Sequence, residues 1–182
     1  MNNIRSFSLK PFPSAGLLPD LKITGNVTRR SKTLAISYAL LGTLSELVIP
    51  APADLPARRN TLWEETCFEF FLRAENSDQY WEFNLSPAGH WNIYRFKSYR
   101  LGMQKEPAFT SLPFRVRRQQ DAFRLSLKLD LGRIIPEDQI LKVGISAVIK
   151  SINGEITYWA LTHTGRQADF HRRDGFILEF YK

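Results

Sequence analysis

Residues 62–97 have the sequence LWEETCFEFFLRAENSDQYWEFNLSPAGHWNIYRFK, and this stretch decides the fold. Apolar residues occupy every second position in two of its segments: Phe68, Phe70 and Leu72, then Trp81, Phe83 and Leu85. A period of two places one set of side chains on the core face of a strand and the other set on the opposite face. The turn-rich sequences AENSD and SPAGH separate the segments. We therefore predict an antiparallel meander whose second face, carrying carboxylates, an amide and aromatic rings, is either solvated or a binding surface.

Strand patterns continue on both sides of this meander. Residues 121–131 alternate cleanly, with Phe123, Leu125, Leu127 and Leu129 predicted to face inward. Further strands are predicted at residues 5–10, 21–30, 32–42, 45–50, 114–120, 140–150, 155–163 and 176–180, with an irregular loop at 99–113 and one helical turn within 131–139. Asn153-Gly154 is a hairpin-turn signal. Many short strands with frequent turns predict an all-β fold, an antiparallel β-sandwich of the immunoglobulin-like or jelly-roll-like kind.

Composition is that of a globular domain. The chain has 182 residues, of which 43% are hydrophobic and 13% aromatic, and this length predicts a single domain spanning residues 1–182. The net charge of +7 is scattered over the chain, whereas a nucleic-acid groove would cluster its basic residues on one face. Cys67 is the only cysteine, and the sequence shows neither a secretory signal nor a membrane-length apolar run. We expect a cytoplasmic protein that binds neither membrane nor nucleic acid.

Catalytic signatures are missing from the sequence. Cys67 has no metal-ligand spacing around it, and neither a nucleophile elbow nor a phosphate-binding glycine loop occurs. His163 and His171 could meet in one loop, but loop packing is favoured over metal binding or catalysis. Glu65 and Glu69 would share a strand face, and a solvated or ion-paired face is favoured over a glycosidase pair. We therefore predict a non-catalytic protein with no cofactor.

Two parts of the chain resemble a known family. Both are similar in order and spacing to the DOMON-like superfamily and its family 9 carbohydrate-binding modules. The first part is LWEETCFEFFL followed by YWEFNLSPAGHWNIYRF, and the second is YWALTHTGRQADFHRRDGFILEF. The resemblance covers roughly residues 60–182. Its matching positions are Trp63, Glu69, Phe71, Asn84, Gly89, Trp159, Phe170, His171 and Gly175. The chain departs from the family at Phe68, where a basic residue is usual, and in a more basic loop after Trp159.

The resemblance implies a β-sandwich in which two tryptophans clamp a sugar. Trp63 and Trp159 match the clamp, and Glu69 matches a carboxylate that binds sugar hydroxyls. The resulting hypothesis is a shallow saccharide site between the two tryptophans, with other ligand-binding residues at Asn84, Arg95, Arg166 and His171. Flat rings bury the apolar face of a pyranose, and charged side chains bond its hydroxyls. The alternative is that both tryptophans are ordinary core or edge aromatics.

Three alternatives concern the ligand. Arg166, Arg172 and Arg173 near Trp159 would favour an anionic saccharide, because arginine suits carboxylate and phosphate geometry, although a solvated basic loop explains them equally well. Some DOMON relatives bind haem through Met and His. The candidates would be Met103 with His163 or His171, but Met103 lies in the polar sequence GMQKEP. The third alternative is a protein-interaction domain with no small ligand.

Overall fold

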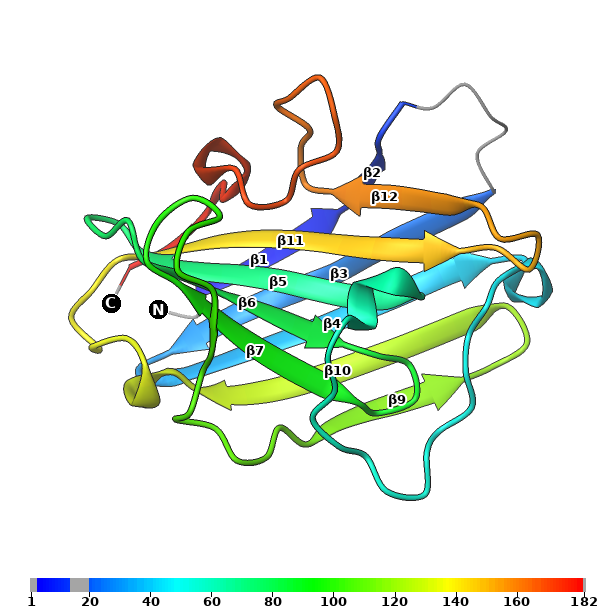
Figure 1. Cartoon of the computed structure of the whole chain (residues 1–182), viewed down its shortest axis with the longest axis horizontal. Helices are drawn as coiled ribbons and strands as arrows, with labels where there is room; N and C mark the ends of the chain where they lie inside the picture. The colour runs from blue at the N-terminus through cyan, green and yellow to red at the C-terminus, as the bar shows by residue number, and fades with distance from the viewer. Residues whose placement is uncertain (1–2, 14–19, 182) are drawn as a thin grey trace.

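Two antiparallel β-sheets stack face to face in the computed structural model, which describes residues 3–13 and 20–181 (Figure 1). We call them the β4 sheet, with order β1-β3-β4-β10-β9, and the β5 sheet, with order β2-β12-β11-β5-β6-β7-β8 and β13 paired to β11. The strands are β1 (Asn3–Ser8), β2 (Lys10–Pro11), β3 (Leu21–Arg30), β4 (Thr33–Gly42), β5 (Cys67–Ala74), β6 (Tyr80–Leu85), β7 (Trp91–Phe96), β8 (Gln104–Lys105), β9 (Phe114–Arg118), β10 (Ala122–Asp130), β11 (Leu141–Lys150), β12 (Ile156–Ala160) and β13 (Leu178–Phe180). The predicted all-β antiparallel sandwich is confirmed.

The main core lies between the sheets. In β10 the burial alternates as the sequence predicts, with Phe123, Leu125, Leu127 and Leu129 all at most 3% exposed. These side chains meet the inward residues of the β5 sheet, among them Phe68, whose ring stacks on that of Phe123 at 5.4 Å. Tyr38 of β4 also crosses the interface, where its hydroxyl donates to the backbone carbonyl of Glu69 at 2.7 Å. The sheets are therefore joined by apolar packing and by a buried hydrogen bond.

Strands β5 and β6 are buried on both faces. Antiparallel sheets commonly expose one face, yet every residue from Cys67 to Arg73 and from Tyr80 to Leu85 is buried. The second face packs a smaller aromatic cluster that comprises Phe71, Tyr80, Tyr94, Phe96 and Phe176, with Trp63 and Phe170 partly buried against it. The meander is confirmed, but its polar face is covered by chain segments.

Regular helix is almost absent from the described residues. They contain only short 3-10 segments, η1 (Leu44–Glu46), η2 (Leu62–Glu64), η3 (Leu131–Arg133) and η4 (Arg173–Gly175), and none of their helices is long and apolar enough to cross a membrane. The helical turn predicted within 131–139 corresponds to η3. The strand predicted at residues 45–50 is wrong, because this segment forms η1 and then a single bridge from Leu47 to Ser151. The predicted irregular loop 99–113 includes β8.

Candidate functional site

The outer face of the β5 sheet carries a polar row at its centre. Strand register places Ser146, Glu69, Asn84 and Asn92 side by side on adjacent strands. All four are buried, Glu69 at 3% exposed. Three of them hold buried oxygens with no hydrogen-bond partner among the described residues, namely Ser146 Oγ, Glu69 Oε1 and Asn84 Oδ1. Buried polar atoms normally have hydrogen-bond partners, so three such unpaired oxygens in one row are unusual.

A pocket of about 440 Å³ reaches this row at Glu69. Its floor and walls come from β5, β6, β7, β11 and β12 together with η2 and the loops around residues 97–103 and 161–177. The lining residues are Trp63, Glu69, Glu82, Phe96, Arg100, Met103, Val148, Tyr158, Ala168, Phe170 and His171. Aromatic rings and two carboxylates therefore border one hollow, which is the usual composition of a site for a small polar ligand.

Two larger hollows lie over the outer face of the β4 sheet. They measure about 530 and 860 Å³ and are lined by a mixture of polar, basic and apolar residues. Neither includes any of the buried polar atoms that lack a partner among the described residues. We therefore place the candidate site in the pocket of the β5 sheet, which is lined by a buried carboxylate with an oxygen that is unpaired within the described part of the chain.

Glu69 and Glu82 are the buried carboxylates of the pocket. Burial raises the pKa of Glu82 to about 7, against a hydrogen bond from Asn84 Nδ2 and the charge of Arg100, which lower it. Burial also raises the pKa of Glu69 well above its ordinary value, and the charge of Glu82 adds to this effect while the Cys67 thiol opposes it. Because desolvation disfavours a charged carboxylate, this pair retains protons at pH values where exposed carboxylates are ionised.

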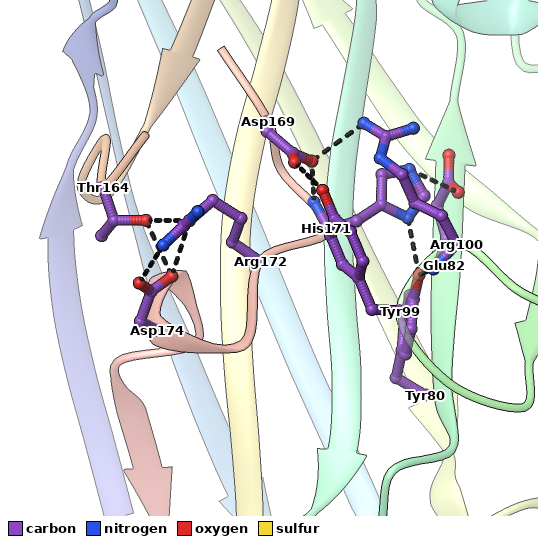
Figure 2. Close-up of polar contacts among 9 residues, drawn as sticks. All are labelled: Tyr80, Glu82, Tyr99, Arg100, Thr164, Asp169, His171, Arg172 and Asp174. Carbon is purple, nitrogen blue, oxygen red and sulfur yellow. Dashed lines mark hydrogen bonds and ion pairs between the residues drawn. The ribbon is translucent and has the colours of Figure 1, made fainter. Parts of the chain in front are cut away.

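His171 links the pocket to the covering loop. Burial and the charge of Arg100 lower the pKa of His171 to about 4, so its ring is neutral at pH 7. Its Nδ1 lies 2.8 Å from the Tyr80 hydroxyl, which accepts a bond from the Arg100 backbone N–H. With Tyr80 donating to Nδ1, the ring proton lies on Nε2 and faces Glu82 Oε2 at 3.6 Å (Figure 2).

Arg100 is held by an acidic partner. Its guanidinium donates to Asp169 Oδ1 at 2.8 Å, and Asp169 also accepts from the Tyr99 hydroxyl and the His171 backbone N–H (Figure 2). These bonds join the loop at residues 97–103 to the loop at 161–177. Among the described residues, the only cationic side chain that lines the pocket is therefore already paired.

Some predicted site residues meet in this pocket. Trp63, Glu69 and His171 line it, and Asn84 lies beside Glu69 and donates to Glu82. Trp63 is partly buried, and its ring makes an edge contact with Tyr94 at 5.8 Å. These four residues are therefore gathered as the hypothesis required.

The predicted clamp partner Trp159 is not at the site, which corrects the hypothesis of two facing tryptophans. Trp159 is 3% exposed and packs in the main core, while its neighbour Tyr158 lines the pocket. A two-residue turn at Asn153-Gly154 would pair Trp159 with Val148, an outward residue. The actual loop is one residue longer, closed by Ser151 N–H to Glu155 carbonyl at 2.8 Å, and it pairs Trp159 with inward Ala147. A shift of one residue exchanges the faces of a strand.

The predicted basic residues also lie elsewhere. Arg95 pairs with Trp81, on the face opposite to Glu69, and donates to Gln104 Oε1 at 3.1 Å, so it is not part of the floor. Arg166 is exposed and lines a neighbouring hollow with Tyr99 and Asp169. Arg172 binds Asp174 at 2.7 Å (Figure 2) and Arg173 binds Asp78. The argument for an anionic ligand therefore loses its basis.

The residues that sequence reasoning did not assign to the site include Glu82, Arg100, Tyr158 and Phe96. Glu82 alternates with Trp81 and Phe83, so its face was predictable, but its partners were not. Arg100 carries a left-handed backbone with φ of 54°, in a loop whose path the sequence does not reveal. Nothing in the local pattern identified it.

The haem hypothesis fits these residues poorly. Met103 and His171 do line the same pocket, but His163 lies outside its lining and contacts the Lys10 carbonyl at 2.8 Å. Both ring nitrogens of His171 face polar partners, Tyr80 and Glu82. An axial ligand needs a free nitrogen, and a porphyrin face needs apolar walls rather than two buried carboxylates.

Comparisons with known proteins agree on the architecture. No protein-family model and no curated protein matches the sequence. One similar solved structure is a protein from Bacteroides uniformis provisionally described as carbohydrate-binding, with 12% identity, a TM-score of 0.71, and coverage of 94% of this chain and 84% of that one. Another is a family 9 carbohydrate-binding module from Caldicellulosiruptor kristjanssonii in complex with glucose, with 9% identity, a TM-score of 0.50, and coverage of 80% and 69%. At such identities the likeness shows the fold, and the DOMON-like assignment stays a prediction.

Proposed function

We propose that this chain is a non-catalytic module that binds a saccharide in the pocket over β5 and β6. The observation that carries the proposal is Glu69, a carboxylate 3% exposed, with Oε1 unpaired among the described residues, on the floor of a pocket bordered by aromatic rings. A bound hydroxyl group would supply the missing partner. Removing such a buried partner is costly, and providing it is correspondingly favourable.

The aromatic wall supports the same proposal. Trp63, Tyr158 and Phe170 line the pocket while keeping part of their surface accessible. Flat rings can cover the C–H face of a pyranose, and each such contact contributes on the order of 1 kcal/mol. The similar structures, one bound to glucose and one provisionally described as carbohydrate-binding, point in the same direction.

The positions of the carboxylates argue against glycoside hydrolysis. Glu69 and Glu82 lie on adjacent strands of one floor, in neighbouring rows of the same face. A glycosidase places its two carboxyl groups on either side of the scissile bond. Both groups here are also almost completely buried, which suits hydrogen bonding from below a ligand.

Calorimetry with neutral and acidic saccharides on the wild type and on two aromatic variants tests the proposal. Trp63→Ala and Tyr158→Ala should each weaken a measured Kd by roughly fivefold, the equivalent of about 1 kcal/mol. Ile152→Ala, an exposed apolar change in the β11–β12 loop, is the matched control and should leave Kd unchanged. Absence of binding by every saccharide on a glycan array and in calorimetry at about 10 mM, where even a weak Kd registers, would refute the proposal.

A further inference from the structure

The pocket gathers acidic groups in a protein of net positive charge. The whole chain carries a net charge of +7, whereas the acidic and basic residues that line the pocket are Glu69, Glu82, Arg100 and His171. Arg100 is paired with Asp169, and His171 is neutral at pH 7. Glu69 and Glu82 are thus the acidic groups of the hollow that form no ion pair with a described lysine or arginine.

Neither carboxylate has a basic partner among the described lysine and arginine side chains. Glu82 accepts from the Asn84 amide and faces the neutral His171 ring, and Glu69 Oε1 accepts from nothing. Other acidic residues of the chain do find cations, as Glu65 does in Lys150 at 2.7 Å. An ionised carboxylate buried without a cation is expensive, so these two groups favour the protonated form in the free protein. A ligand that brings its own positive charge would stabilise the ionised form.

The walls suit a cation as well. Trp63, Tyr158, Phe170 and Phe96 all line the pocket. The negative face of an aromatic ring attracts ammonium groups, most strongly where water is excluded. Carboxylates below and aromatic rings beside the ligand are the two features that recognise a protonated amine.

We propose that the saccharide bound here carries a protonated amine, so that the pocket is specific for an amino sugar, whose ammonium group bonds Glu69 while the ring contacts Trp63 and Tyr158. This inference rests on the proposed function and names the class of sugar. It reverses the expectation of an anionic ligand, because the arginines behind that expectation are paired or lie outside the pocket. The pKa values of Glu69 and Glu82, which burial raises, agree with it, because a bound ammonium group would favour the ionised carboxylates.

The test compares three sugars that differ only at one carbon. Glucosamine carries an ammonium group there, glucose a hydroxyl, and N-acetylglucosamine a neutral acetamide. Calorimetry at pH 7 in amine-free phosphate buffer should give glucosamine a Kd at least tenfold below that of either neutral sugar. Binding should also release protons, because the ammonium group ionises carboxyls that are protonated in the free protein. Titrations in a second buffer of different ionisation enthalpy measure that release.

Two isosteric variants test which carboxylate produces the preference for glucosamine. Glu69→Gln should abolish the preference for glucosamine, and Glu82→Gln should reduce both the preference and the proton release. Glu65→Gln removes an exposed carboxylate that precedes β5 and should leave the preference intact. Circular dichroism establishes that each variant is folded, and the comparison of sugars on the wild type stands even if a variant is not.

The outcomes separate this inference from the proposed function. Glucose bound as tightly as glucosamine would overturn the amine assignment and leave a saccharide module. No binding by any of the three sugars or by the wider panel would overturn both. Ethanolamine, which has the ammonium group without the ring, should bind at least tenfold more weakly than glucosamine. Equal binding of the two would overturn the assignment to an amino sugar.

Discussion

Replacing Glu82 by glutamine should change how the stability of the protein depends on pH. Glu82 is 4% exposed, and burial is the main reason that its pKa is raised from 4.5 to about 7. Between these values the unfolded chain releases the proton that the folded chain keeps. Stability from this group is therefore full below about pH 4.5 and is lost as pH rises through 7. Glutamine has nearly the same shape and can accept the bond from Asn84, but it does not ionise.

The size of the effect follows from the rise in pKa. At about 1.4 kcal/mol per pH unit, a rise from 4.5 to about 7 corresponds to about 3 kcal/mol. The unfolding free energy of Glu82→Gln minus that of the wild type should therefore grow by about 3 kcal/mol between pH 4.5 and pH 8. The depressed pKa of His171 acts in the opposite direction, since stability from His171 is full above 6.5 and is lost as pH falls through 4. Taking the difference between two proteins that both contain His171 removes most of that contribution.

Urea denaturation followed by tryptophan fluorescence at half-unit pH intervals measures this difference. Glu65→Gln is the control, because Glu65 is about half exposed and binds Lys150 at the surface. Its difference from the wild type should stay within about 0.5 kcal/mol across the range, as is usual for surface changes. A Glu82→Gln curve parallel to that of the wild type would show that Glu82 is not held protonated by burial, and the electrostatic account of the pocket would fail.

Three further changes test the packing. Leu127→Ala, at a side chain 3% exposed between the sheets, should lower the unfolding free energy by about 2–5 kcal/mol in urea titrations, and a loss below about 1 kcal/mol would contradict its place in the core. Trp159→Phe should lower thermal stability yet leave saccharide affinity unchanged in calorimetry, whereas a large loss of affinity would return Trp159 to the site. Gly144→Ala would place a Cβ 2.8 Å from Phe176 Cδ1; hydrogen exchange should quicken across residues 170–177 but not in β10, and unchanged exchange there would contradict the packing of Phe176 on the sheet.

Much of the fold could be predicted because the two-residue alternation of a strand can be read from a short stretch of sequence. Phe68, Phe70 and Leu72 face the main core, and Glu69 lies on the opposite face, as the alternation required. Core residues of β10 were predictable for the same reason. The strand predicted at 45–50 failed because Leu47 makes only an isolated bridge, and a single strand pattern does not reveal whether a partner strand is available.

The site was harder to predict because it depends on register and on loops. Trp159 and Tyr158 are adjacent aromatics, and only the length of the loop before β12 decides which one faces outward. Arg95 was also misplaced by register: it was predicted to lie on the floor of the site, but its strand pairing puts it on the opposite face of the sheet. Arg100 and the cover at residues 161–177 come from irregular segments, whose path over the sheet leaves no periodic signal.

The buried apolar residues form two separate clusters. The free energy needed to admit a ligand is therefore distinct from the free energy of unfolding. The main core is closed between the sheets, and the aromatic cluster with Phe71 and Phe176 lies on the other side of β5 and β6. Chain segments held by few buried contacts open at a lower free energy than the core of a domain. Phe170 and Phe176 of the covering segment pack on the aromatic cluster and not in the main core. Displacing this cover would therefore cost those aromatic contacts and leave the packing between the two sheets in place.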